Sequence, residues 1–364
     1  MSDRWLLYVG SYTRTPYEHT GAKATGQGIY ILDFNLETGQ IKESKKVFLM
    51  ENPAYFIFSP DGKYLFVNSE VPEWSEGRIT TYRVNKRNGD LKYVGHRKSY
   101  GALPFYFDMD STGKWLFTVN YLGGNVLIFP VHDNGVLGKP TDNVHHHGVG
   151  SKRLRQEAAH PHCIVLDPAG RFCAVPDLGQ DKIFFYELEL KYGKLFKYGF
   201  VKVPSGSGPR RFVYHPNRKF AYNTNELNGT VSAWAYDESK GWITPLENYN
   251  CLPEGFKYEN AVADIKIHPA GKFLYVTNRG HDSIAIFKIN RYSGKLTLQG
   301  VKSTGGRTPR SILIDPTGKF LMVVNQLSDM VISFKINQET GTLSETGFRV
   351  EVPTPSFLAL KQLP

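Results

Sequence analysis

A short phrase repeated along the chain constrains its fold more than any other feature of the sequence. Most copies place Asp, His or Ser before a Pro-x-Gly turn and a Lys or Arg, between two apolar runs. Proline presets φ and glycine tolerates positive φ, so the phrase predicts a tight turn between two strands. Successive copies lie 47 to 57 residues apart and begin at Ser59, Asp110, Asp167, His215, His268 and Asp315. Such a period, with several strands per unit, is typical of β-propeller blades.

The repeat that begins at His268 shows how each unit is built. Residues 273–277 are rich in β-branched and aromatic side chains and predict a buried strand. Residues 283–289 alternate with period two, and a Ser-Gly turn then leads to the run 295–298. Together with the strand before the turn, each unit predicts a four-stranded antiparallel blade, and the six phrases predict six blades.

The two ends of the chain predict a seventh blade. Residues 5–45 contain three strand-like runs but lack the first strand of the repeat, whereas residues 355–360 match the first-strand pattern of residues 53–58. We therefore expect an all-β fold, a single seven-bladed β-propeller domain over residues 1–364. The C-terminal strand is expected to join the N-terminal strands and close the ring, which removes an exposed sheet edge.

Equivalent positions of the repeat gather at one mouth of the central channel in such a ring. At the start of the first strand stand Ala54, Phe105, His162, Arg210, Ala263 and Arg310, and directly after them Tyr55, Tyr106, Cys163, Arg211, Asp264 and Ser311. The second strand ends on asparagine in most blades, which predicts a structural turn cap. The next positions hold Glu70, Tyr121, Leu178, Glu226, Arg279 and Gln326.

The chemistry of these positions changes from blade to blade, which favours a binding site over a purely structural role. Like charges repel one another near a common axis, so a mouth without a ligand has little need for several arginines. The planar guanidinium group of arginine suits carboxylate or phosphate. The pattern therefore predicts a site for a small anion.

The overall charge agrees with this prediction. The formal net charge is +10, from 44 Lys and Arg against 34 Asp and Glu, and the lysines are scattered through turns, so we expect no nucleic-acid partner.

No apolar run approaches ~20 residues and the first residues lack a secretory pattern, so we expect no membrane partner and a cytoplasmic location. Three cysteines without metal-ligand spacing fit reduced thiols in that compartment.

One stretch between predicted blades, residues 143–159, is long for a propeller connection, and we expect it to cover the mouth as a flap. It contains three consecutive histidines, His145, His146 and His147. Neighbouring positions point in different directions and no fourth ligand has suitable spacing. This motif therefore predicts a mobile loop and not a metal site.

Several motifs taken together resemble a known family. They occupy residues 156–162 (QEAAHPH), 175–179 (VPDLG), 208–210 (GPR), 225–227 (NEL), 278–283 (NRGHDS) and 305–310 (GGRTPR). The chain is similar over about residues 5–360 to the seven-bladed lactonases, which include propeller-type 6-phosphogluconolactonases and fungal carboxy-cis,cis-muconate cyclases. The resemblance implies an enzyme that acts on an anionic sugar lactone without a metal or other cofactor. It also implies catalytic roles for His162, Arg210, Glu226 and Arg279, with His160 and Arg310 near the same mouth.

Four positions depart from the pattern of that family. Tyr106 follows Pro-Phe where members commonly carry histidine, and Arg211 replaces the histidine of Gly-Pro-Arg-His. Asp264 stands in place of glutamate, and Ser311 in place of aspartate. We expect these changes to alter a second ring of side chains and therefore the choice of substrate. The predicted substrate-binding residues are His160, Arg211, Asp264, Arg310 and Tyr106.

Opening a lactone with water requires a base, donors for an oxyanion and an anchor for the anionic group. We expect His162 to be the base because free imidazole titrates near ~6.5. Glu226 would orient that imidazole or share the proton transfer, and Arg210 and Arg279 would hold the anion and the developing charge. The first candidate substrate is 6-phosphogluconolactone.

Two alternative functions remain: cycloisomerisation of a muconate-type diacid by the same residues, and a propeller that binds an anion or a partner without turnover. The sequence defines no oligomeric state.

Overall fold

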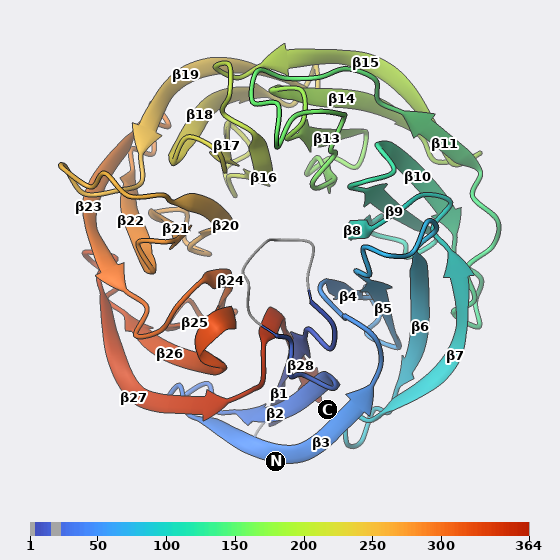
Figure 1. The fold of residues 1–364 in the computed structure, drawn as a ribbon, viewed down its shortest axis with the longest axis horizontal. Coiled ribbons are helices and arrows are strands. Elements are labelled where there is room, and N and C mark those ends of the chain that lie inside the picture. The colour runs from blue at the N-terminus through green and yellow to red at the C-terminus, as the bar shows by residue number, and fades with distance from the viewer. Residues whose placement is uncertain (1–3, 16–22, 364) are drawn as a thin grey trace.

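Seven four-stranded antiparallel sheets form a ring around a central axis (Figure 1). The computed structural model describes residues 4–15 and 23–363. From the innermost strand outward, blade 1 consists of β28 (Pro355–Leu363), β1 (Arg4–Ser11), β2 (Gly28–Phe34) and β3 (Ile41–Leu49). Blade 2 consists of β4 (Phe56–Phe58), β5 (Tyr64–Ser69), β6 (Arg78–Val84) and β7 (Leu91–Lys98). Blade 3 consists of β8 (Pro104–Met109), β9 (Trp115–Asn120), β10 (Asn125–Pro130) and β11 (Asp142–His145).

The other four blades follow in chain order. Blade 4 consists of β12 (Val165–Leu166), β13 (Phe172–Asp177), β14 (Lys182–Glu189) and β15 (Lys194–Lys202). Blade 5 consists of β16 (Pro209–Tyr214), β17 (Phe220–Asn225), β18 (Thr230–Asp237) and β19 (Trp242–Asn250). Blade 6 consists of β20 (Ala261–Ile267), β21 (Phe273–Arg279), β22 (Ser283–Ile289) and β23 (Leu296–Ser303). Blade 7 consists of β24 (Pro309–Ile314), β25 (Phe320–Asn325), β26 (Met330–Ile336) and β27 (Leu343–Glu351), with a 3₁₀ helix, η1 (Gln326–Ser328), after β25.

Burial within a blade follows the sequence pattern. Every residue of β13 and β25 is buried, because both faces of these strands pack against neighbouring blades. The outermost strand β27 alternates between exposed and partly buried side chains. Continuous apolar runs therefore mark the second strands, and alternating runs mark the outer edge of the ring. The prediction of an all-β propeller with seven four-stranded blades is confirmed.

The ring closes as the ends of the sequence predict. Strand β28 pairs with β1 along its length, from Arg4 opposite Leu363 to Ser11 opposite Pro355. Leu358 of β28 belongs to one buried cluster with Val9 of β1 and Val324 of β25. The C-terminal strand is thus the innermost strand of blade 1 and also packs against blade 7, and the two chain ends meet in one blade (Figure 1).

Irregular pairing at the start of the innermost strands directs side chains toward the channel mouth. In β16, Arg210 and Arg211 together oppose the single residue Thr224 of β17. The Arg211 amide donates to Thr224 Oγ1 at 3.1 Å, which satisfies the backbone group that the bulge displaces. The same irregularity occurs in β8, β20 and β24 and between β1 and β28. Because a bulge turns an additional side chain away from the regular pleat, the repeat presents its first-strand residues at the mouth.

The asparagines that end the second strands have the structural role predicted for them. The side-chain amides of Asn120, Asn278 and Asn325 donate to backbone carbonyls of the preceding blade connections at 2.8, 2.9 and 3.2 Å. Asp177, at the same position in blade 4, instead accepts the backbone amide of His160 at 2.8 Å. In blades 3, 4, 6 and 7 this position therefore ties the blade to the connection that leads into it, whereas the Asn225 amide of blade 5 donates to Thr230 and Ser232 of its own blade.

The expectation of a mobile loop at the three histidines is wrong. His145 ends strand β11, the outermost strand of blade 3, and His146 is buried. The His146 ring contacts Asp177 Oδ2 through Nδ1 and the Tyr186 hydroxyl through Nε2, both at 2.7 Å. Sequence alone did not show that two buried polar partners on blade 4 would hold this ring.

Two further observations concern the chain as a whole. Within residues 4–15 and 23–363, no helix is long and apolar enough to cross a membrane. The three cysteines, Cys163, Cys173 and Cys251, are all buried and form no disulfide.

Closure by β28 predicts a specific loss of stability. Leu358→Ala should lower the free energy of unfolding by about 2–5 kcal/mol, because it leaves a cavity between blades 1 and 7. Leu298→Ala on β23, where the side chain is 39% exposed, is the matched control and should change it by about 0.5 kcal/mol or less. Urea unfolding followed by tryptophan fluorescence measures both. Equal effects of the two substitutions would contradict this account of closure.

Candidate active site

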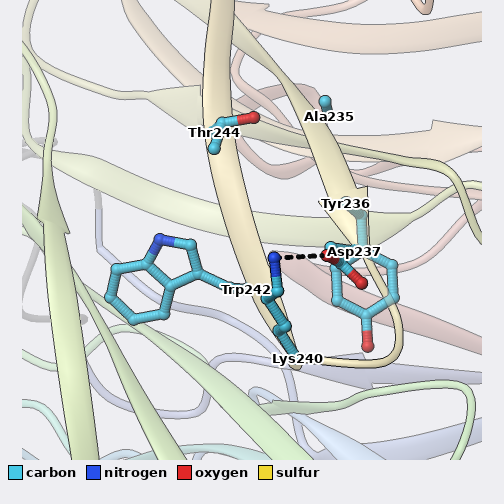
Figure 2. Close-up of a pocket in the computed structure, with 6 residues that line it drawn as sticks. All are labelled: Ala235, Tyr236, Asp237, Lys240, Trp242 and Thr244. Atoms are coloured by element: carbon cyan, nitrogen blue, oxygen red, sulfur yellow. Dashed lines mark ion pairs between the residues drawn. The ribbon is translucent and has the colours of Figure 1, made fainter.

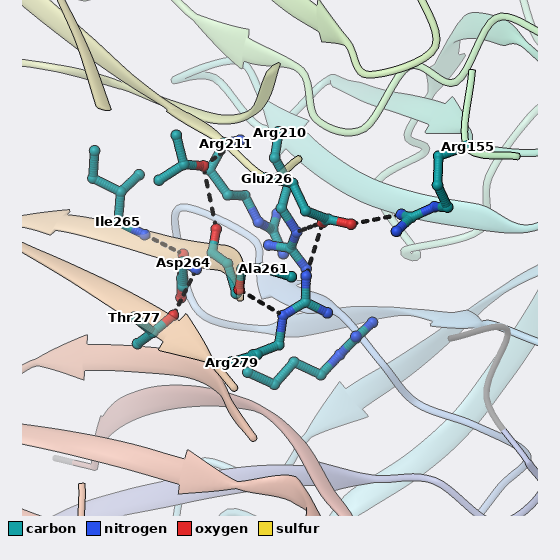
Figure 3. Close-up of polar contacts among 12 residues, drawn as sticks. Arg155, Arg210, Arg211, Glu226, Ala261, Asp264, Ile265, Thr277 and Arg279 are labelled. Atoms are coloured by element: carbon teal, nitrogen blue, oxygen red, sulfur yellow. Dashed lines mark hydrogen bonds and ion pairs between the residues drawn. The ribbon is translucent and has the colours of Figure 1, made fainter. Parts of the chain in front are cut away.

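One buried carboxylate binds three arginines at the channel mouth (Figure 3). Glu226 follows β17 in blade 5 and accepts Arg210 Nε from the adjacent strand β16 at 2.7 Å. Arg279, at the end of β21 in blade 6, places Nη2 2.9 Å from the same carboxylate oxygen. Arg155, from the connection between blades 3 and 4, donates to the other oxygen at 2.6 Å. Three cations share one anion, so the cluster carries an excess of positive charge.

A second carboxylate, Glu70, lies at the equivalent position of blade 2 and binds Arg310. The Arg310 Nη2 atom is 3.2 Å from Glu70 Oε2, and the Tyr12 hydroxyl donates to Glu70 Oε1 at 2.9 Å. The Arg310 guanidinium also lies over the Tyr12 ring, 5.1 Å from its centroid. The sequence analysis did not assign Glu70 and Tyr12 to the site. Their repeat positions could have identified them, because Glu70 matches Glu226 and Tyr12 holds that position in the split blade.

His162 lies buried among these arginines. Its ring packs edge-on against Phe105 and Tyr121, with centroid distances of 4.3 and 5.6 Å. Burial and the charges of Arg210, Arg211, Arg310 and Arg279 lower its pKa well below the ordinary value of 6.5. Nδ1 of this ring has no hydrogen-bond partner in the described part of the chain. The site therefore holds a neutral imidazole in a strongly positive environment.

The four positions that the sequence analysis expects to alter a second ring of side chains form one connected group. Arg211 lies over the Tyr106 ring, 4.3 Å from its centroid, and Tyr106 stacks on Tyr55 at 4.0 Å. Burial raises the pKa of Asp264, but Lys266, Arg211 and two hydrogen bonds outweigh it and lower the pKa below its usual value. The Ser311 hydroxyl donates one of those bonds to Asp264 at 2.8 Å. These substitutions therefore form a coupled layer next to His162.

His160 occupies a supporting place behind the mouth. Its ring stacks on Tyr121 with an interplanar angle of 10°. Nδ1 contacts the Tyr121 carbonyl at 3.1 Å and Nε2 contacts the Glu157 carboxylate at 2.8 Å. Both ring nitrogens thus face protein acceptors, which places His160 as a support for the segment that leads into His162.

The long connection before His162 reaches across to blade 5, as expected for a flap over the mouth. Arg155 binds Glu226, and Lys152 Nζ donates to the Leu227 carbonyl at 2.6 Å. Gln156 anchors the segment through Nε2, which donates to Leu178 O and Asp181 Oδ1, each at 2.8 Å. Sequence reasoning missed Arg155 as a site residue. It lies outside the repeated blade positions, and only the path of the connection brings it to Glu226.

A separate hollow of about 210 Å³ lies on the β18–β19 hairpin of blade 5 (Figure 2). Tyr236 and Trp242 line it, together with an exposed ion pair of 3.3 Å between Lys240 and Asp237. This hairpin lies at the end of blade 5 opposite Glu226, and none of the mouth residues lines the hollow.

Among the described residues, no group of three or more His, Cys, Asp or Glu side chains could hold a metal ion.

Comparison with known proteins identifies the family to which the chain belongs. The family described as "Lactonase, 7-bladed beta-propeller" matches residues 6–360, and the chain belongs to this family. It is 32% identical over 310 residues to the 6-phosphogluconolactonase of Bacillus subtilis, which covers 85% of each chain. It is 35% identical to the 6-phosphogluconolactonase of Formosa agariphila, covering 84% of this chain and 85% of that one. The structure of a periplasmic gluconolactonase of Pseudomonas aeruginosa superposes with a TM-score of 0.90 and 31% identity, over 99% and 100% of the two chains.

Removing the shared carboxylate should destabilise the mouth. Glu226→Gln takes away the negative charge that Arg155, Arg210 and Arg279 share, and we expect a loss of about 3–5 kcal/mol in the free energy of unfolding. Glu345→Gln, on the exposed outer strand β27, is the control and should cost less than about 1 kcal/mol. Thermal and urea unfolding test both variants, and a Glu226→Gln protein as stable as the control would refute the pairing.

The lowered pKa of His162 predicts how stability depends on pH. An unfolded histidine takes up a proton near pH ~6.5, whereas the folded protein resists protonation until a lower pH. The unfolded state therefore binds more protons in that window, and this contribution to stability is lost as the pH falls below ~6.5. His162→Gln should flatten the decline between pH 6.5 and 5 in urea unfolding. A decline that is unchanged in the variant would show that His162 is not the responsible group.

Proposed function

We propose that the protein hydrolyses an anionic sugar lactone at the channel mouth, with 6-phosphogluconolactone as the first candidate substrate. The observation that carries the proposal is the buried ring of His162, whose Nδ1 has no hydrogen-bond partner among the described residues and which lies in the field of four arginines. A neutral base next to fixed positive charge suits attack by water on a carbonyl that becomes an oxyanion. Membership of the lactonase family and the names of the relatives support the same reaction.

The reaction follows from these groups in two steps. His162 takes a proton from water as the water oxygen bonds to the lactone carbonyl carbon, and the carbonyl oxygen becomes an oxyanion. Arg210 and Arg279 donate charge-assisted hydrogen bonds to that oxyanion. When the intermediate collapses, the ring C–O bond breaks and the His162 imidazolium returns its proton to the leaving oxygen. The hydroxy acid then ionises at neutral pH, so each turnover releases one proton.

Glu226 acts in this proposal by positioning the arginines. Its two oxygens contact three guanidinium groups, which favour the ionised carboxylate and occupy its acceptor sites. This role replaces the expectation that Glu226 orients the imidazole. Tyr106, Arg211, Asp264 and Arg310 complete the proposed binding surface, and His160 supports it from behind.

Loss of the base should abolish most of the activity. His162→Ala should lower kcat/KM for 6-phosphogluconolactone by about 10²–10⁴-fold, the usual contribution of a general base. His132→Ala, on an exposed turn of blade 3, is the matched control and should keep wild-type activity. Proton release in a weakly buffered pH-indicator assay measures the rate, after the spontaneous opening of the lactone is subtracted.

The outcome also separates the other candidate functions. Full activity of a folded His162→Ala protein would contradict the assignment of the base. Ring closure of a muconate-type diacid without any opening of sugar lactones would identify a cycloisomerase. Binding of 6-phosphogluconate without turnover of either substrate would identify a propeller that only binds its ligand.

A further inference from the structure

The arginines that surround His162 differ in how their charges are compensated. Arg210 and Arg279 contact Glu226, and Arg310 contacts Glu70. Within residues 4–15 and 23–363, Arg211 has no carboxylate within ion-pair distance, and its buried Nε and Nη1 atoms have no hydrogen-bond partner. Arg211 nevertheless is only 7% exposed. The positive charge of Arg211 is therefore buried without a carboxylate in direct contact among the described residues.

The surroundings of Arg211 hold the charge in place without neutralising it. Arginine stays protonated in proteins, so it cannot relieve burial by losing a proton. The ring centroids of Tyr106 and Tyr55, which stack on each other, lie 4.3 and 5.3 Å from its guanidinium carbon, and this packing holds the guanidinium in position. The nearby Asp264 carboxylate instead accepts the Ser311 hydroxyl at 2.8 Å and the Ile312 amide at 3.1 Å. A pre-positioned cation with unused donors is what an oxyanion ligand requires.

A second buried side chain at the mouth also has unused hydrogen-bonding capacity. Gln326 follows the second strand of blade 7, the repeat position that Glu226 and Arg279 occupy in blades 5 and 6. It is 1% exposed, and neither Oε1 nor Nε2 has a partner in the described chain. An amide offers both a donor and an acceptor, which matches the hydroxyl groups of a sugar.

We propose that Arg211, which packs against the stacked rings of Tyr106 and Tyr55, is the anchor for a terminal phosphoryl or carboxylate group of the substrate. Arg210 and Arg279, whose charges Glu226 shares, then act at the lactone carbonyl. This inference deepens the proposed function and rests on it. It predicts a substrate with an oxyanion at the end opposite the lactone carbonyl and hydroxyl groups between the two ends, within reach of Gln326.

Binding measurements on the full chain test the anchor directly. The probes are 6-phosphogluconate, gluconate and inorganic phosphate, titrated by calorimetry into wild type, Arg211→Met, Arg211→Lys and the exposed control Arg349→Met. Arg211→Met should weaken 6-phosphogluconate binding by about 10- to 100-fold, the loss expected for charge-assisted hydrogen bonds. The affinity of Arg211→Lys for 6-phosphogluconate should lie between those of wild type and Arg211→Met, because lysine keeps the positive charge but lacks the planar guanidinium group. Arg349→Met should bind as wild type does.

Stability and kinetics provide independent readouts. Arg211→Met removes an uncompensated buried charge, so its unfolding temperature should not fall below that of wild type, and inorganic phosphate should stabilise wild type but not the variant. The ratio of kcat/KM for 6-phosphogluconolactone to that for glucono-δ-lactone should fall by the same 10- to 100-fold. Weaker binding of 6-phosphogluconate than of gluconate by wild type would contradict a phosphoryl anchor, because the two probes differ only in the terminal phosphoryl group.

The failure of the anchor and the failure of the proposed function can be told apart. A folded Arg211→Met protein with wild-type affinity for all three probes and an unchanged kinetic ratio would overturn the anchor. Wild-type protein that opens neither lactone, but binds 6-phosphogluconate through Arg211, would support the anchor and contradict the hydrolase.

Discussion

The mouth of this propeller depends on the sharing of one buried carboxylate by three arginines. Glu226 contacts Arg210 from its own blade, Arg279 from blade 6 and Arg155 from the connection between blades 3 and 4. A charged side chain buried without a partner would be costly, so this contact fixes parts of the chain that are distant in sequence. This contact holds the long connection before His162 against blade 5 and fixes the two arginines that we propose act at the lactone carbonyl. Because one anion serves three cations, the same contact also leaves the positive potential that an anionic substrate needs.

The repeat made the fold predictable, and its columns made part of the site predictable. Bulges at the start of the innermost strands present Arg210 and Arg310 at the mouth, and the charges of both act on His162, so residues of one column meet in space. What the repeat could not show is which acceptor each long side chain reaches. Arg155 belongs to no column, and only the structure shows that Arg310 contacts both Glu70 and Tyr12. His146 was misjudged for the same reason, because its partners Asp177 and Tyr186 lie on the next blade.

The residues that distinguish this chain from the family pattern are physically coupled. Arg211 packs on Tyr106, Asp264 lies in its electrostatic reach, and Ser311 donates to Asp264. A change at one of these positions alters the charge or packing that the others experience. In the proposed reaction, the chemistry around His162 and the recognition of the far end of the substrate are divided between two adjoining layers, the first organised by Glu226 and the second by Arg211.

A structure of the protein crystallised with 6-phosphogluconate, the product of the proposed reaction, tests this division most directly. The account predicts that the sugar carboxylate lies beside His162 and the Glu226-bound arginines, and that the phosphoryl oxygens accept hydrogen bonds from Arg211. A product bound in the opposite direction, with its phosphoryl group at Arg210 and Arg279, would contradict the division of roles. A product bound away from the channel mouth would contradict the site itself.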